Sequence, residues 1–294
     1  MRMTVTELVE EWLSTCRPAY AQDTEIGYRN HIKAFAKQHS VETLEDFDTE
    51  ELAAWVHDRK LSPSSQRSRR NALRAFFRWV VQRRYLDADP TELIPAPKAT
   101  RPTPKPLKPE EVAAVLRAAR RTDADHRSAK GHVCEVMATL MVQEGLRSVE
   151  VRRLQVGDVD LDNRQIYLHG KNDRGRVLPL SEQTCSVIRR HLAVIGHRSG
   201  PLLSTKGTFE PMSKASVNHR MNRIFNNSGV KRGPYDGKSA HSLRSTAATD
   251  VYRECLDVRA VQAMLGHSHL SSTQHYIELA TAEHLRDAMT GRRY

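Results

Sequence analysis

Tyr276 lies among histidines in the stretch VQAMLGHSHLSSTQHYIEL, residues 261–279, near the end of the chain. A phenol, with a pKa of about 10, is a poor base, and a tyrosine usually serves packing. It acts as a nucleophile only with help from cations supplied elsewhere in the chain. Attack on a phosphodiester needs the same help, because negative charge builds on the non-bridging oxygens and fixed cations must offset it.

Three short stretches supply such cations. EGLRSVEVRRL places Arg147 just after a helix-stopping glycine, with Glu150 one turn on and close enough to orient it. HSLRSTAATDVY places His241 and Arg244 at i and i+3, so both project from one helical face. HGKNDRGRVLPL places Lys171 on the turn of a predicted hairpin. Each stretch alone is more typical of a solvated surface, so the inference depends on their combination.

The segment around Tyr276 has its own helix signal. Ser271 and Gln274 form an S-x-x-Q capping box, which predicts a short helix with Tyr276 in its second turn and His267 in the preceding loop. The histidines of this segment have no cysteine or carboxylate partner in register. We therefore expect no metal site here.

Together these stretches resemble the tyrosine recombinase (phage integrase) family over about residues 108–280. The motifs stand in order and with family-like spacing: Arg147 in GLRxxE, Lys171 in a GK…R..PL hairpin, His241 and Arg244 in HxLRxTxAT, His267 in LGH, and Tyr276 nine residues later. The departures are small. Ser245 stands where many members have histidine, and residues 172–174, Asn-Asp-Arg, replace the common Gly-Asn-Lys.

The resemblance implies a mechanism that suits these residue types. The implied catalytic set is Tyr276 as nucleophile with Arg147, Lys171, His241, Arg244 and His267, supported by Glu150. The arginines would each give two parallel hydrogen bonds to the phosphate, and the histidines would add donors. Lys171 would protonate the 5′-oxygen leaving group. Tyr276 would hold the DNA as a 3′-phosphotyrosyl ester, so no cofactor is needed for rejoining. The acceptor of the Tyr276 proton stays open between His241 and Lys171.

The resemblance also implies the partners. We expect double-stranded DNA with core-type attachment sites, a C-shaped clamp around it, and a homo-tetramer acting on two sites, with an accessory DNA-bending factor as a further partner. The tail, residues 277–294, spaces Ala282, Leu285 and Met289 along one helical face. It either docks on a neighbouring protomer or caps its own domain.

The composition fits a DNA partner. Net charge is +11 and the pI is about 9.7, which indicates a polyanionic partner. Arginine greatly outnumbers lysine, which suits phosphate recognition but equally follows from a GC-rich genome. The N-terminus has acids where a signal peptide needs an apolar region, and the four cysteines are scattered. We therefore expect a cytoplasmic protein that does not enter the membrane: it is nucleoid-associated or, if phage-encoded, in the host cytoplasm.

Proline spacing divides the chain. Seven of the thirteen prolines fall between Pro90 and Pro109, which predicts an extended linker. The predicted parts are a helical core-type DNA-binding domain at 1–88, a linker at 89–107 and a catalytic domain at 108–294. The chain begins almost at once with the core-binding helices, so we expect an architecture without an arm-binding domain.

Apolar spacing gives the elements of each part. The N-terminal part predicts helices at 4–16, 22–38 and 49–59 and another from Ser62. The C-terminal part predicts helices at 108–121, 131–144, 182–195, 213–227, 241–254 and 257–265, a short one from Ser148, and strands at 165–169 and 176–180. The fold class is mostly α: a SAM-like helical bundle plus a mixed α/β catalytic domain with a small antiparallel sheet.

The helix from Ser62 carries an arginine stripe. Arg67, Arg74 and Arg78 fall within about 40° of one another at 100° per residue. Leu73, Phe76 and Val80 lie on the opposite side. Residues 59–84 hold nine Lys and Arg and no acid. We expect the apolar face to pack on a core and the stripe to contact DNA, with DNA-binding residues Arg67, Arg70, Arg74 and Arg78.

The predicted function is a site-specific DNA recombinase or integrase of a phage or other mobile element. An Xer-type chromosome or plasmid dimer resolvase and a catalytically silent DNA-binding regulator are the alternatives. A type IB topoisomerase would use the same residues to relax DNA, without synapsis of two DNA sites. A metal-free ribonuclease would use the RNA 2′-hydroxyl and form no covalent adduct. The regulator requires a defective motif, and all six catalytic positions are filled.

Overall fold

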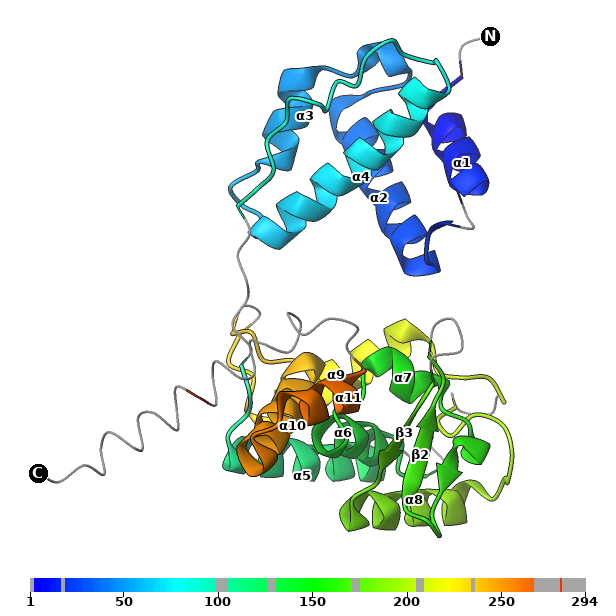
Figure 1. Ribbon diagram of the computed structural model, residues 1–294, viewed down its shortest axis with the longest axis vertical. Coiled ribbons are helices and arrows are strands. Elements are labelled where there is room, and N and C mark those ends of the chain that lie inside the picture. Colours follow the sequence, from blue (N-terminus) through cyan, green and yellow to red (C-terminus); the bar gives the residue numbers. More distant parts are fainter. Residues whose placement is uncertain are drawn as a thin grey trace, which may run out of the picture. The chain divides into compact units, whose positions relative to one another are not determined.

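The chain folds into two compact units, Met1–Pro102 and Thr103–Tyr294, in the computed structural model (Figure 1). The structure describes residues 3–16, 19–98, 105–125, 131–170, 175–204, 209–233, 236–266 and 281. The division falls inside the proline-rich segment 89–107.

Unit 1 is helical in the described residues. It contains α1 (Val5–Cys16), α2 (Gln22–His39), a 3-10 turn (Leu44–Asp46), α3 (Thr49–Val56) and α4 (Pro63–Gln82). The predicted helices are confirmed, and their start signals are visible: the Asp48 carboxylate caps α3, and Ser62 caps α4 ahead of a first-turn proline.

The core of unit 1 is aromatic. The predicted inward residues of α4, Leu73, Phe76 and Val80, are fully buried. Phe76 packs edge-on against Trp12, with ring centroids 5.5 Å apart. The three tryptophans of the chain, Trp12, Trp55 and Trp79, are all buried in this unit. Burial of these large rings, with the aliphatic side chains of the same core, supplies the driving force that holds the helices together.

The start of the predicted linker is not a free extended segment. Thr91 and Ile94 are buried against unit 1. Two arginines of α4 hold the segment: Arg70 Nε donates to the Ile94 carbonyl at 2.8 Å, and Arg67 Nη2 donates to the Pro97 carbonyl at 3.2 Å. Proline removes backbone donors but leaves carbonyls, and the guanidinium groups bind those carbonyls.

Unit 2 is mixed α/β. Its helices are α5 (Pro109–Asp125), α6 (Val133–Gln143), α7 (Ser148–Arg153), α8 (Glu182–Ile195), α9 (Lys214–Ser228), α10 (Ala240–Cys255) and α11 (Val258–Leu265). Strands β1 (Val159–Asp160), β2 (Gln165–Leu168) and β3 (Arg176–Pro179) form an antiparallel sheet in the order β1-β2-β3. The predicted hairpin is confirmed, with Leu168 opposite Arg176. The predicted fold class is confirmed.

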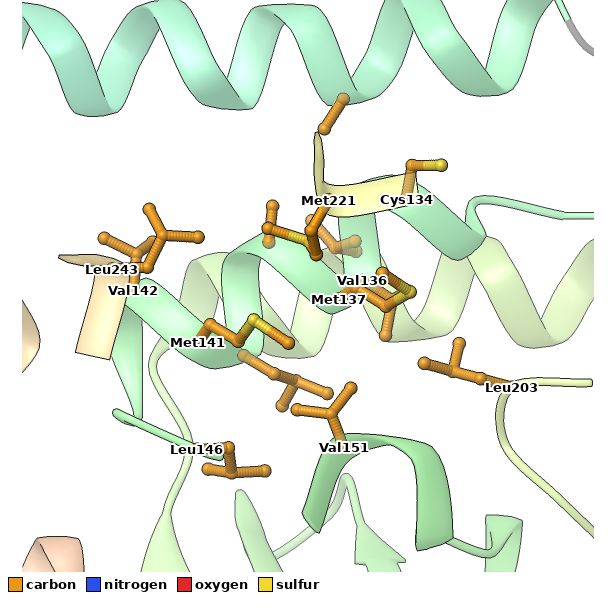
Figure 2. Close-up of a cluster of buried hydrophobic side chains, with 14 of the residues drawn as sticks. Cys134, Val136, Met137, Met141, Val142, Leu146, Val151, Leu203, Met221 and Leu243 are labelled. Carbon is orange, nitrogen blue, oxygen red and sulfur yellow. The ribbon is translucent and has the colours of Figure 1, made fainter. Parts of the chain in front are cut away.

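Helix α6 is the centre of unit 2. All of its residues from Val133 through Val142 are buried, and α5, α8 and α10 pack around it. Figure 2 shows Met137 and Met141 of this helix among side chains from α7, α9 and α10. A helix that is apolar all round must be buried. The core therefore fixes the position of the chain that leaves α6, where Arg147 follows.

Within the described residues, no helix is long and apolar enough to cross a membrane.

We predict that Phe76→Ala lowers the unfolding free energy of unit 1 by about 3–5 kcal/mol, because it leaves a cavity under Trp12. Tryptophan fluorescence during urea unfolding reports on unit 1 alone, since all three tryptophans lie there. Leu93→Ala is the control: the Leu93 side chain is 89% exposed, and the change should stay within about 0.5 kcal/mol. Equal shifts for the two variants would contradict this account of the core.

Candidate active site

Arg147 stands at the entry to α7. Gly145 has a φ of +65° and ends the preceding helix, as predicted from the sequence. A Cβ at Gly145 would lie 2.9 Å from Met264 Cε and 3.2 Å from Leu265 Cδ2 of α11. The glycine therefore permits both the left-handed turn and the close packing of α11 against it. The backbone then places Arg147 as the N-cap residue of α7.

Glu150 holds Arg147 in place. The backbone amide of Arg147 donates to Glu150 Oε2 at 2.7 Å, and Arg147 Nη1 donates to Oε1 at 3.0 Å. The predicted orienting contact is therefore present. The Glu150 side chain is 12% exposed and that of Arg147 is 37% exposed. The carboxylate is buried under the site, while part of the guanidinium faces solvent.

Two further arginines reach the same carboxylate. Arg176 Nη1 donates to Glu150 Oε1 at 3.0 Å, and Arg244 Nη1 lies 3.6 Å from Oε2. Burial acts to raise the pKa of Glu150. The hydrogen bonds from Arg176 and from the Arg147 amide, with the charges of Arg176 and Arg244, outweigh it and hold this pKa below its usual value. Glu150 is therefore ionised at neutral pH.

Arg244 is buried on the inner side of α10. Its residue exposure is 2%, and its guanidinium donates to the carbonyls of Gly145 and Leu265, the latter at 2.7 Å. It ties together the two chain turns that end α6 and α11. In the structure, which contains no DNA, this guanidinium is part of the frame of the site.

His241 lies one turn before Arg244 and is exposed. Partial burial of the imidazole against the protein lowers its pKa most, because it disfavours the charged form, and the positive charges of Arg244 and Arg147 lower it further. His241 and Arg244 are three residues apart on α10, so their side chains share one face of that helix. The His241 imidazole is neutral at pH 7, so one ring nitrogen is an acceptor and the other a donor. The Ser245 hydroxyl donates to the His241 carbonyl at 3.0 Å.

The end of α11 completes the frame. Gly266 has a φ of +60°, and a Cβ there would lie 2.5 Å from Arg176 Nη1. Arg176 Nε donates to the Met264 carbonyl at 3.1 Å. The glycine of the LGH motif thus lets the Arg176 guanidinium pack directly against the backbone that leads to His267.

The segment that enters unit 2 is tied to α10. Lys105 Nζ donates to the Asp236 carbonyl at 2.8 Å, just before that helix. The Leu107 amide donates to Thr246 Oγ1 at 2.8 Å, and that hydroxyl also donates to the Ser242 carbonyl. The threonine of the HxLRxTxAT motif therefore anchors the incoming chain.

The structure brings together four of the residues predicted for this site: Arg147, Glu150, His241 and Arg244. Lys171, His267 and Tyr276 lie outside the described residues, as do the Ser271–Gln274 capping box and the tail at 277–294, residue 281 excepted. Sequence reasoning missed Arg176 as a member of the cluster. The sequence does contain a signal for it, because Arg176 is the R of the GK…R..PL pattern. From the sequence alone this arginine is assigned only to a strand.

The arginines of α4 form a separate surface in unit 1. Arg67 and Arg70 hold the 91–97 segment, while Arg78 is exposed and Arg74 half-exposed on the same helix. Among the described residues, no acidic side chain forms an ion pair with Arg74 or Arg78. Their charges are available to a polyanion.

Comparisons with family models match both units. The model described as "Phage integrase family" matches residues 105–283, and the model "Phage integrase, N-terminal SAM-like domain" matches residues 8–87. A SAM-like helical unit followed by this mixed α/β unit defines the tyrosine recombinases, enzymes that cut and rejoin DNA. The chain belongs to the phage integrase family.

Individual relatives agree. Tyrosine recombinase XerC of Haemophilus ducreyi is 29% identical, over 86% of this chain and 82% of the relative. Tyrosine recombinase XerD of Caulobacter vibrioides is 29% identical, over 87% and 88%. Among solved structures, XerH bound to a palindromic difH substrate has a TM-score of 0.72 and 21% identity, over 96% and 84%. A lambda integrase tetramer bound to a Holliday junction has a TM-score of 0.72 and 19% identity, over 94% and 77%. At these identities the structures show the fold.

We predict that Arg147→Gln raises the pKa of His241 toward 6.5, because it removes one of the two nearby positive charges. Histidine NMR titration would follow it. His31 is the control, since burial and Arg69 lower its pKa in unit 1 and neither changes. A wild-type His241 pKa at or above 6.5, or one insensitive to the substitution, would contradict this electrostatic account.

The same shift predicts a stability effect. The pKa of His241 is lower in the folded than in the unfolded chain, so the unfolded chain takes up the proton first. As pH falls below about 6.5, this histidine therefore lowers the unfolding free energy of unit 2. His241→Gln should lose less stability than wild type between pH 7 and pH 5. Hydrogen exchange of α10 amides would measure the difference, and parallel losses would contradict it.

Proposed function

We propose that the protein is a site-specific DNA recombinase that cuts and rejoins DNA through a 3′-phosphotyrosyl intermediate formed by Tyr276. The observation that carries the proposal is the gathering of Arg147, Arg176 and Arg244 on the Glu150 carboxylate, with neutral His241 beside them. One buried anion orients several cations, which is what a developing phosphorane charge requires.

The roles follow from the chemistry of each group. The half-exposed Arg147 side chain would bind a non-bridging phosphate oxygen, and Arg244 would hold the frame from below and contribute its charge. His241 and His267 would donate to the phosphate. Tyr276 would attack phosphorus, forming the phosphotyrosyl bond as the bond to the 5′-oxygen breaks. Lys171 would protonate that 5′-oxygen, and His241 and Lys171 both remain candidates to take the tyrosine proton.

The DNA would be a core-type site bound by both units. The comparison structures are a XerH complex with its difH substrate and a lambda integrase tetramer on a Holliday junction. By analogy we propose a homo-tetramer on two sites in the cytoplasm, with an accessory DNA-bending factor and with the tail 277–294 as the candidate contact between protomers. In unit 1, Arg74 and Arg78 would contact phosphates directly, while Arg67 and Arg70 would also hold the 91–97 segment.

Two biological roles fit this activity. The sequence favours the integrase of a phage or other mobile element. The XerC and XerD relatives favour the second candidate, an Xer-type resolvase of chromosome or plasmid dimers. Efficient exchange between two identical sites on one DNA molecule would support the resolvase, and exchange between two different sites would support the integrase.

We predict that wild-type protein forms covalent adducts with a library of nicked, randomised duplexes, and that Tyr276→Phe forms none. A nick beside the cut lets the short 5′-hydroxyl fragment diffuse away, which traps the ester. Adducts are detected after SDS denaturation, and sequencing them reveals the site. Tyr252→Phe in α10 is the matched control and should keep adduct formation. Binding by wild type without any adduct would favour the DNA-binding regulator.

We predict that Arg74→Gln and Arg78→Gln each weaken DNA binding at all sequences and lower the slope of log K against log salt by about 1. Lys33→Gln removes the same charge from a lysine paired with Glu10 at 2.9 Å, and serves as the control. Binding would be measured by band shift at several salt concentrations. An unchanged slope for both arginine variants would mean that Arg74 and Arg78 do not contact the DNA phosphates.

A further inference from the structure

Arg176 has contacts that a strand residue does not need for pairing. It is the first residue of β3, which pairs with β2, and its side chain is 20% exposed. One end of its guanidinium binds the Glu150 carboxylate, and the other binds the Met264 carbonyl of α11. The side chain thus crosses from the sheet to two helical segments that form the site.

We propose that Arg176 is a positioning residue for strand cleavage, which holds the Glu150 carboxylate, and through it Arg147, in register with the Gly266 turn. The inference rests on the proposed function for its consequence in catalysis. It assigns Arg176 no contact with the DNA.

The shared oxygen is the first argument. Glu150 Oε1 accepts from Arg147 Nη1 and from Arg176 Nη1, both at 3.0 Å. The carboxylate therefore cannot rotate toward one guanidinium without lengthening its bond to the other. Two fixed donors on one acceptor leave Arg147 a single orientation, which is the preorganisation that a charge-stabilising site needs.

The unpaired donor is the second argument. Arg176 Nη2 is buried and has no hydrogen-bond partner among the described residues. An unsatisfied buried donor costs free energy. A side chain selected for stability alone would avoid that cost, for example as an aliphatic residue. The cost is consistent with a role in holding the site.

Gly266 is the third argument. The Arg176 guanidinium occupies the volume where any other residue at 266 would place its Cβ. Two parts of the sequence, the R of the hairpin and the glycine of LGH, are therefore matched to one contact. Through this contact Arg176 fixes the backbone immediately before His267.

The charged groups around Glu150 come from three elements. Arg147 lies at the start of its own helix, Arg176 comes from β3 and Arg244 from α10, while His241 lies near Arg147 and Arg244. Burial raises the pKa of Glu150, and the Arg176 cation is one of the groups that offset this effect. The Arg176→Gln substitution removes that cation, so the pKa of Glu150 rises. Glu150 then protonates as pH falls, and Arg147 loses its anchor. Arg176→Lys keeps the charge and loses only the second hydrogen bond.

The test measures single-turnover adduct formation on the nicked substrate from pH 5.5 to pH 8.5. Arg176→Gln should be slower than wild type by about 10- to 100-fold at the acid end and less at the alkaline end, the loss expected for one hydrogen bond between charged groups. Arg176→Lys should keep the wild-type profile at a reduced rate. His241 also titrates, and Arg147 contributes to its pKa, so histidine NMR measures the His241 pKa in every variant and separates its contribution from that of Glu150. A loss for Arg176→Gln that is equal at every pH, together with a Glu150 pKa unchanged from wild type, would overturn the proposal, because a merely structural defect gives that result.

A double-mutant cycle and a titration complete the design. In a Glu150→Gln background, Arg176→Gln should have little further effect; losses that multiply would also overturn the proposal. Carbon-13 NMR of labelled glutamate should show a higher Glu150 pKa in Arg176→Gln than in wild type, and an unchanged value would count against it. This titration needs no DNA. A wild-type protein that forms no adduct would therefore defeat the proposed function while the titration still decides the role of Arg176.

Discussion

The Glu150 carboxylate is the group around which unit 2 arranges its cations. It is nearly buried, and an isolated ionised carboxylate there would be unstable. Three guanidinium groups from three segments compensate it. Since one negative charge faces three positive ones, the cluster keeps a surplus of positive charge. A buried anion thus serves to collect cations that would otherwise repel one another, and the surplus is what a phosphodiester would meet.

Two glycines allow that cluster to form. Gly145 ends α6 with a left-handed residue and leaves room for α11, and Gly266 ends α11 in the same way and leaves room for Arg176. Arg244 donates to a carbonyl in each of the two turns. The site is therefore built from helix ends, where carbonyls lack helical partners and accept from arginine. The motif glycines leave the space and expose the carbonyls that the arginines bind, so the two kinds of residue depend on each other.

Much of the fold can be predicted because its signals are local. Helix α4 begins where Ser62 caps it, and its apolar face follows from spacing along the helix. The Arg147–Glu150 contact spans three residues and can be predicted in the same way. Arg176 bonds to a carboxylate 26 residues away, and Arg244 bonds to carbonyls 21 and 99 residues away. No local pattern encodes such contacts. For the same reason the packing of the 91–97 segment on α4 could not be predicted from its prolines.

The attachment of the incoming chain to α10 has a mechanical consequence. The connector enters unit 2 through Lys105 and Leu107, which bond to the turn before α10 and to Thr246 within it. At its other end the connector is held by α4 through Arg67 and Arg70. A pull on the chain at Lys105 and Leu107 would therefore act first on the helix that carries His241 and Arg244, before the rest of the unit 2 core.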